Sequence, residues 1–271
     1  MGTSGERVDG SAGQTPVWRP PRTRRAIFAQ PLPAQQHSPL NRLICRACMM
    51  LARNRILSVE GLEHVAPERD PFVLVLNHNQ QAEAVLLPAA LIYWRGGRLI
   101  HFLSDWNFRL IPVVATILRR SGTIVLVQKP ARPRFLNVFR PLFQKGRTGL
   151  HRALDMLRAG HSVGVFPEGT VNPDPRRMLE GHRGAARISL SAGVPVVPAG
   201  IRFPGIDPAR PIPPSAPFTV RIGPPMTPPA PARPGRPSPD EVRAWHHRIM
   251  LEIARLSGKR WEPGPGRKGS Q

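Results

Sequence analysis

Short apolar runs that alternate with longer helical stretches constrain the fold of this chain more than any other feature of its sequence. Five runs have the length and the branched residues of buried strands, at residues 72–76, 100–103, 124–127, 163–166 and 194–201. Helical stretches lie between them, among them residues 149–159 and 180–192. This alternation is typical of a parallel sheet buried under helices on both faces. We therefore predict an α/β fold, a single domain with a mostly parallel sheet flanked by helices.

The two ends of the chain differ in composition from this central part. Residues 1–40 mix Gly, Ser, Gln, Pro and Arg without periodicity, which predicts a flexible basic arm that adds nothing to the core. The main domain is expected at residues 41–230, beginning with a basic amphipathic helix at 41–57. A Pro-rich linker, a C-terminal helix that starts at Ser238 and a tail are expected at 231–271. The density of prolines makes residues 218–222 a candidate edge strand.

The charge balance favours an anionic partner. The chain has 39 Lys plus Arg against 17 Asp plus Glu, a formal net charge of +22. Nucleic acid, an anionic bilayer and a phosphorylated substrate all fit that total. The two cysteines, Cys45 and Cys48, form no disulfide framework, so we expect reduced thiols on a lipid-facing helix. We expect no transmembrane helix, because no apolar run is long enough to span a bilayer, and no signal peptide, because the N-terminal residues lack an apolar core.

The first candidate site lies where the apolar run at residues 72–76 ends. Asn77 and His78 follow directly, and Glu83 stands five residues after His78. On a regular helix these two side chains would lie about 140° apart, so we expect His78 in a turn and Glu83 in the first turn of the next helix. The carboxylate then accepts a hydrogen bond from one imidazole nitrogen and leaves the other as a general base. Asn77 is expected to anchor the turn. A capping or solvent-facing histidine is the alternative.

The second candidate site follows the run at residues 163–166. Glu168, Gly169 and Thr170 come after Pro167, and a glycine there lets the backbone approach a ligand closely. Such strand ends are where the active groups of α/β sheets usually lie. Taken alone, this segment is equally compatible with an ordinary turn.

Together, these residues resemble the lysophosphatidic acid acyltransferase family of glycerolipid acyltransferases. That family carries Asn-His-x4-Asp in its first block, seen here as Asn77-His78-x4-Glu83, and Phe-Pro-Glu-Gly-Thr in its third, seen here unchanged at residues 166–170. The Val-Pro pair of its fourth block is similar to residues 193–198. The resemblance covers about residues 56–223 and leaves both ends of the chain unexplained.

The resemblance implies transfer of a fatty acyl group from a thioester, on coenzyme A or acyl carrier protein, to the hydroxyl of a lysophospholipid such as 1-acyl-glycerol-3-phosphate. It implies that His78 removes the proton of that hydroxyl while Glu83 orients the imidazole. Asn77, Glu168, Gly169 and Thr170 fall in the blocks that form the substrate site. Because phosphate repels a carboxylate, we expect Glu168 on a hydroxyl or on the backbone of the site. No metal or redox cofactor is implied.

Two positions depart from the family pattern. Glu83 replaces the usual Asp, which lengthens the carboxylate arm by one methylene. In the second block, the position of the arginine that binds the acceptor phosphate falls on Gln128, followed by Lys129, whose point charge lacks the two-pronged contact of arginine. Another acceptor, such as a lyso-aminolipid, therefore stays open, and so does a non-catalytic membrane lipid-binding protein.

The remaining candidates are cations near these blocks. They are expected to meet phosphates of substrate or membrane, with solvated surface as the plain alternative: Arg119, Arg120, Arg176 and Arg177. The basic amphipathic helix suits an anionic membrane surface, which predicts a peripheral protein on the cytoplasmic side. No nucleic-acid partner is expected, because a single tyrosine and little interleaving of aromatic and basic residues leave few positions for base stacking.

Overall fold

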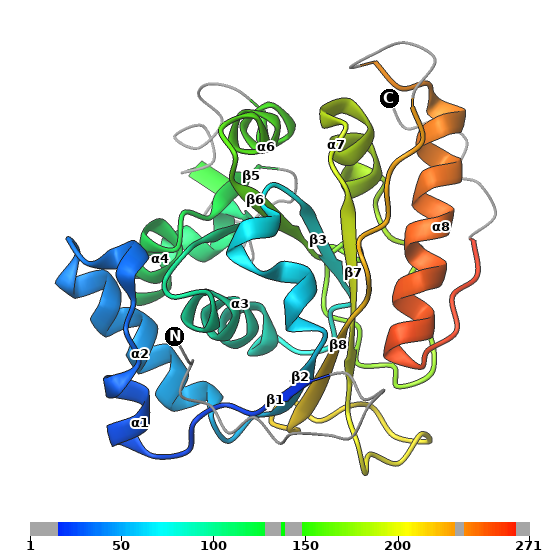
Figure 1. Cartoon of the computed structure of the whole chain (residues 1–271). Helices are drawn as coiled ribbons and strands as arrows, with labels where there is room; N and C mark the ends of the chain where they lie inside the picture. The colour runs from blue at the N-terminus through cyan, green and yellow to red at the C-terminus, as the bar shows by residue number, and fades with distance from the viewer. Residues whose placement is uncertain (1–15, 128–136, 139–147, 231–235, 264–271) are drawn as a thin grey trace.

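An eight-stranded sheet forms the centre of the protein (Figure 1). The computed structural model describes residues 16–127, 137–138, 148–230 and 236–263. Across the sheet the strands follow the order β1 (Val17–Trp18), β2 (Ile56–Glu60), β8 (Phe218–Ile222), β7 (Val196–Arg202), β3 (Val73–Leu76), β6 (Ser162–Val165), β4 (Ile100–Asp105) and β5 (Ile124–Leu126). Among the described strands, the pairs β1–β2 and β7–β8 are antiparallel and the others are parallel. The predicted α/β fold with a mostly parallel sheet is confirmed.

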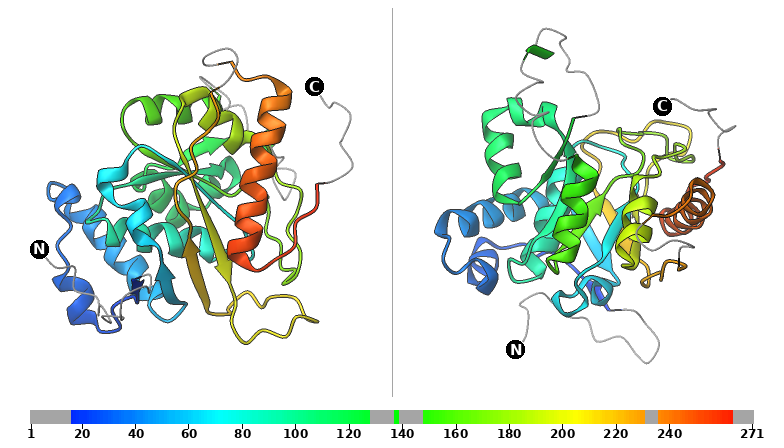
Figure 2. Two further views of the ribbon diagram at one scale, coloured as in Figure 1. Left: turned by 45° about the vertical axis from the view of Figure 1, so that its right-hand side comes forward. Right: turned by 90° about the horizontal axis from the view of Figure 1, so that it is seen from above.

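Helices cover both faces of the sheet (Figure 2). They are α1 (Arg24–Ala29), α2 (Pro39–Ala52), α3 (Glu83–Trp94), α4 (Pro112–Arg120), α6 (Gly149–Arg158), α7 (Gly184–Ala192) and α8 (Pro239–Ser257). Short 3-10 helices occur at Pro33–Gln35, Leu62–Val65, Pro67–Arg69 and Trp106–Leu110. One core cluster joins α1, α2 and α3 to the sheet, and a second joins α6, α7 and α8 to its other face.

The position of β3 in the centre of the sheet explains why its sequence is continuously apolar. Val73 and Val75 pack into the cluster with α6, α7 and α8, whereas Leu74 and Leu76 pack into the cluster with α1, α2 and α3. Successive side chains of a strand point to opposite faces, so a strand covered on both sides needs apolar residues at every position. The chain that leaves β3 is therefore held rigidly from both faces.

The C-terminal helix α8 belongs to the same core as the rest of the domain. Ser238 and Glu241 form the capping box that starts it, as the sequence predicts. The backbone of α8 lies close to Gly200 in β7. A Cβ atom at that glycine would lie only 2.2 Å from the carbonyl carbon of Leu256. The expected division at residue 230 therefore does not separate two packing units.

The predicted flexible arm at residues 1–40 is wrong for its second half. β1 pairs with β2, and the side chain of Ile27 in α1 is completely buried. The hydroxyl of Tyr93 on α3 donates a hydrogen bond to the carbonyl of Ile27 at 3.1 Å. The apolar run at residues 26–29 is too short to show a helical period, although Ile27 within it fills a place in the core. Residues 1–15 lie outside the described part of the chain.

Two further elements differ from the prediction. The expected helix at 41–57 ends at Ala52, and Ile56 begins β2 instead, in which Ile56 and Val59 are buried. The predicted edge strand β8 lies inside the sheet, between β2 and β7. Its prolines stand before and after residues 218–222 rather than within them, so its backbone donors on both sides stay available for pairing.

Candidate active site

The two candidate sites meet at one edge of the sheet. β3 and β6 are neighbouring parallel strands, so the segments that follow Leu76 and Val165 leave the sheet on the same side. The amide of His78 donates a hydrogen bond to Oε1 of Glu168 at 3.0 Å, which joins the first block directly to the third. The fold thus builds one site from residues 90 positions apart.

The imidazole of His78 and the carboxylate of Glu83 form the predicted pair. His78 lies in the turn after β3, Glu83 is the first residue of α3, and Nδ1 lies 2.9 Å from Oε1. The Glu83 side chain is 0% exposed, whereas that of His78 is 13% exposed. The longer glutamate therefore still reaches the imidazole. Its carboxylate also lies at the N-terminal end of α3, which is the positive end of the helix dipole.

The geometry fixes which imidazole nitrogen is available for chemistry. An ionised carboxylate only accepts hydrogen bonds, so Nδ1 carries the proton and Nε2 carries the lone pair. Among the described residues, no hydrogen-bond partner of Nε2 is found. The ring of Phe166 lies against the imidazole with a centroid distance of 4.7 Å and limits its rotation. The imidazole of His78 is thus held in place through Nδ1, with Nε2 as its other nitrogen.

Asn77 anchors the turn, as predicted, through the neighbouring strand β7. Its Oδ1 accepts a hydrogen bond from the amide of Ile201 at 2.7 Å, and its Nδ2 donates to the carbonyl of Ile201 at 3.2 Å. The Asn77 side chain is completely buried. Both ends of its amide are therefore used inside the protein, so the assignment of Asn77 to substrate binding is wrong.

Glu168 binds the backbone of the site, which is one of the two roles expected for it. Besides the amide of His78, its carboxylate accepts hydrogen bonds from the amide of Leu179 at 2.9 Å and from Nδ2 of Asn172 at 2.8 Å. The residue is buried. Glu168 thus shapes the turn that holds His78 and has its oxygen atoms directed away from solvent.

Gly169 and Thr170 form the exposed rim beside Glu168. Gly169 has a φ of +64°, a conformation that other residues rarely adopt. A Cβ atom there would also lie 2.7 Å from Cδ2 of His182, so the close approach of this backbone requires glycine. Both residues are open to solvent and reachable by a ligand.

Comparison with known proteins identifies the family. The profile of the family described as Acyltransferase matches residues 56–202, more than half of the chain, and that match contains both His78 and Glu168. The chain belongs to the acyltransferase family. A chloroplastic 1-acyl-sn-glycerol-3-phosphate acyltransferase of Arabidopsis thaliana is 27% identical over 142 residues, and one of Brassica napus is 28% identical over 140 residues. Each alignment covers 52% of this chain and 35% of the relative, so the chain matches about a third of the length of these relatives.

A solved structure shares the fold of this acyltransferase. The crystal structure of the 1-acyl-sn-glycerophosphate acyltransferase PlsC from Thermotoga maritima superposes with a TM-score of 0.54. The likeness covers 87% of each chain at 22% identity. It therefore extends beyond the family match, to the ends of the chain that the sequence motifs leave unexplained.

The predicted cations of the acyltransferase lie in different places. α4 begins at the edge that holds His78 and runs back, so Arg119 and Arg120 at its end lie toward the opposite edge. Arg120 donates to Oδ1 of Asn41 on α2 at 3.0 Å. The structure therefore does not bring this pair to His78, which corrects its assignment to substrate binding, whereas a contact with membrane phosphates stays a prediction.

The second pair of cations follows Glu168 in its own loop. The amides of Arg176 and Arg177 donate to Oδ1 of Asp174, at 2.7 and 3.1 Å, and both side chains are exposed. These two arginines are therefore exposed in the loop that Asn172 joins to Glu168, through its hydrogen bonds to Glu168 and to the carbonyl of Arg177. Lys129 lies outside the described residues.

Three residues of the site were missed by sequence reasoning: Asn79, Asn172 and Lys259. Asn79 donates to Glu83 through its backbone amide and through Nδ2, and Asn172 holds Glu168. Lys259 contacts Asn79 from 180 positions away. The two asparagines stand close to the motifs, whereas no sequence pattern points to Lys259. Within the described residues, no group of three or more His, Cys, Asp or Glu is placed to hold a metal ion.

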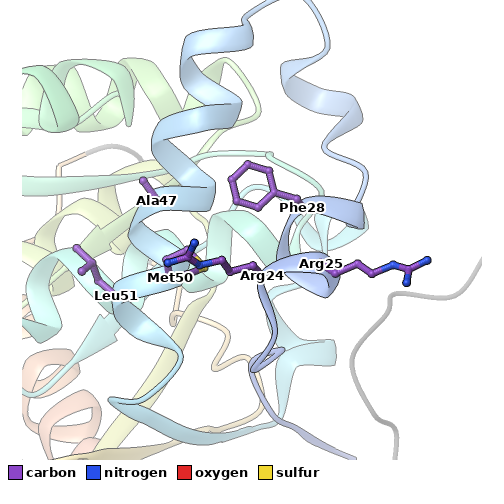
Figure 3. A pocket seen from close by; sticks show the side chains of 6 residues that line it. All are labelled: Arg24, Arg25, Phe28, Ala47, Met50 and Leu51. Atoms are coloured by element: carbon purple, nitrogen blue, oxygen red, sulfur yellow. The ribbon is translucent and has the colours of Figure 1, made fainter.

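A separate apolar surface lies on α1 and α2. An open groove of about 660 Å³ runs between the two helices (Figure 3), lined by Arg24, Arg25, Phe28, Ala47, Met50 and Leu51. Leu40, Leu43, Ala47 and Leu51 form an exposed stripe along α2, and Leu51 is 68% exposed. Among the described helices, none is long and apolar enough to cross a membrane.

The thiols of α2 face the other way. Cys45 and Cys48 are buried against the core, so the expected lipid-facing thiols are wrong. Burial raises the pKa of the Cys45 thiol to about 12. The exposed apolar stripe lies on the opposite side of this helix, because the two cysteines, Met49 and Ala52 fill the core side.

Proposed function

We propose that this acyltransferase moves a fatty acyl group from an acyl thioester to the free hydroxyl of a lysophospholipid, 1-acyl-glycerol-3-phosphate, in phospholipid biosynthesis. The observation that carries the proposal is the hydrogen bond between Nδ1 of His78 and Glu83, which leaves Nε2 as a base at the rim of the site. The names of the two plant relatives support the choice of acceptor.

The proposed reaction begins with proton transfer to His78. Nε2 takes the proton of the acceptor hydroxyl as the hydroxyl oxygen attacks the thioester carbonyl carbon. The tetrahedral intermediate then collapses, the carbon–sulfur bond breaks, and the thiolate takes the proton back from the imidazolium. Glu83 stabilises the imidazolium that forms between the two steps. General-base catalysis of this kind contributes about 10²- to 10⁴-fold in rate, or about 3–5 kcal/mol.

The proposed chemistry needs no metal or redox cofactor. The thioester is already an activated acyl group, and the histidine–carboxylate pair supplies the base. Coenzyme A and acyl carrier protein both present such a thioester, so both are candidate donors. Arg176 and Arg177 are exposed in the loop that follows Glu168 and suit a phosphate of either substrate.

We propose that the exposed surface of α1 and α2 binds the anionic cytoplasmic surface of a membrane as a peripheral contact. Phe28 and Leu51 offer apolar side chains to the acyl boundary, and Arg24 and Arg25 line the same groove. A basic residue near an anionic leaflet contributes about 1 kcal/mol. Lysophospholipids reside in such membranes, so the contact brings the acceptor to the protein. No nucleic acid is needed as a partner.

A product screen tests the proposed function. The purified protein receives one acyl-coenzyme A, or the acyl carrier protein thioester, together with a panel of lysolipids, and products are identified by mass spectrometry. We expect acylation of 1-acyl-glycerol-3-phosphate and its loss in His78→Ala. Acylation of a lyso-aminolipid alone would correct the acceptor, and no acylation with any pair would support a lipid-binding protein.

A further inference from the structure

A buried lysine reaches the catalytic turn from outside the matched family region. The family match ends at residue 202, whereas Lys259 follows α8. Gly258 ends that helix with a φ of +73°, which turns the chain back toward the sheet. The Lys259 side chain is buried, and Nζ donates hydrogen bonds to Oδ1 of Asn79 and to the carbonyl of Asp174.

Neighbouring residues lock this segment in place. The amide of Arg260 donates to the carbonyl of Arg176 at 2.7 Å, and the amide of Met178 donates to the carbonyl of Arg260 at 2.9 Å. Nε1 of Trp261 donates to the carbonyl of Glu180 at 3.2 Å. The backbone after α8 is thus paired with the loop that follows Glu168, so the position of the lysine is fixed by the fold.

The ammonium balances buried negative charge. Glu83 and Glu168 are both buried, and an uncompensated carboxylate in such a place is costly. Among the Lys and Arg side chains of the described chain, only Arg95 and Lys259 are buried, and Arg95 pairs with Asp70. Burial lowers the pKa of Lys259, and attraction to Glu168, Glu83 and Asp174 opposes that shift.

Hydrogen bonds connect the ammonium to the imidazole. Oδ1 of Asn79 accepts from Lys259 and, at 3.3 Å, from Nδ2 of Asn77. The opposite end of the Asn79 amide, Nδ2, therefore faces Oε2 of Glu83 at 3.4 Å, and the Asn79 backbone amide donates to Oε1. Glu83 in turn holds Nδ1 of His78.

We propose that Lys259 is a positioning residue of the active site, which acts through Asn79 to keep the Glu83 carboxylate aligned with His78. The proposal rests on the proposed acyl transfer. It gives the C-terminal segment a part in catalysis, since this segment supplies the cation that the catalytic carboxylate lacks within its own motif.

The pH dependence of the reaction carries the signature of this role. The charged groups around the ammonium are Glu83 on α3, Glu168 and Asp174 in the loop after β6, and His78 beyond Glu83. Loss of the positive charge makes it easier for these groups to bind a proton, and a protonated imidazole is no base. The acid limb of the profile of kcat/KM against pH therefore moves to higher pH, by about one unit.

The test compares three substitutions. We expect Lys259→Met to lower kcat about tenfold or more, with little change in KM and with the shifted acid limb. Lys259→Arg keeps the charge and moves the limb back toward the wild-type pH. Arg260→Met removes the same charge from the exposed neighbouring side chain and leaves both kcat and profile unchanged. Where Lys259→Met does not fold, Lys259→Gln replaces it.

A second readout separates this inference from the proposed function. The protonation midpoint of the His78 imidazole is followed by NMR, with the signal assigned through His78→Ala. We expect a higher midpoint in Lys259→Met than in wild type, whether or not the acceptor is known. An unchanged midpoint and an unchanged acid limb would overturn the role of Lys259. If the wild-type protein transfers no acyl group and the midpoint is still higher in Lys259→Met than in wild type, only the proposed function is refuted.

Discussion

Replacement of Glu83 by glutamine removes the charge beside the imidazole while keeping the size of the side chain. If the amide oxygen occupies the place of Oε1, His78 keeps its hydrogen bond, but an NH₂ group then faces Nδ2 of Asn79, where Oε2 stands now. If the amide is reversed, an N–H group faces Nδ1 and forces the imidazole proton onto Nε2. The first arrangement loses the charge that stabilises the imidazolium, and the second also loses the base.

We expect kcat/KM of Glu83→Gln to fall about 10³- to 10⁴-fold, equal to about 4–5 kcal/mol of transition-state stabilisation. Neutralising the orienting carboxylate of a serine protease costs about 10⁴-fold, which sets the upper end of this range. KM changes little, because Glu83 is completely buried behind His78. The assay follows thiol release from acyl-coenzyme A with 1-acyl-glycerol-3-phosphate as acceptor.

The control for this prediction is Glu83→Asp. It keeps the charge but draws the carboxylate back by about 1.5 Å, one carbon–carbon bond, so its activity falls less than that of Glu83→Gln. Thermal unfolding shows whether each variant keeps its fold. If folded Glu83→Gln stays within about threefold of wild type, the imidazole does not depend on this carboxylate and the reasoning is refuted.

Three further predictions test the anchor of the His78 turn and the two sides of α2. Asn77→Ala leaves both backbone groups of Ile201 without their partner, so urea unfolding should report a loss of about 2 kcal/mol or more; an unchanged midpoint would contradict the anchor. Leu51→Glu should weaken sedimentation of the protein with anionic vesicles and leave its thermal stability unchanged. The control is Leu251→Glu on the exposed side of α8, which should bind the vesicles as wild type does. The buried Cys45, whose pKa burial raises to about 12, should react with Ellman's reagent only as the protein unfolds; rapid reaction in the native state would show that the α2 packing is wrong.

The parts of the fold that follow from sequence are those in which burial imposes a pattern. The strand at Val73–Leu76 is apolar at every position because helices cover both faces, and the start of α8 is marked by its capping box. The parts that sequence misses depend on single contacts. Ile27 is the buried residue of the short helix α1, and the pairing of β1 with β2 involves two residue pairs. The hydrophobic periodicity of the sequence does not reveal such contacts.

The active site shows the same division. His78 and Glu83 are close in sequence, so the geometry of a turn that leads into a helix is enough to predict their contact. The link between His78 and Glu168 follows from the parallel pairing of β3 with β6. Lys259 depends on the way α8 packs across Gly200 and then turns at Gly258. Such a position is set by tertiary packing, so the sequence alone cannot reveal it.

The central claim is that His78 is the base of an acyl transfer to a lysophospholipid. The most direct measurement is acceptor-dependent thiol release by wild type and by His78→Gln, each shown to be folded, with acyl-coenzyme A and 1-acyl-glycerol-3-phosphate in anionic vesicles. The account predicts release by wild type only when the acceptor is present, and a rate at least about 10²-fold lower in the variant. A folded variant that releases thiol at the wild-type rate would contradict it.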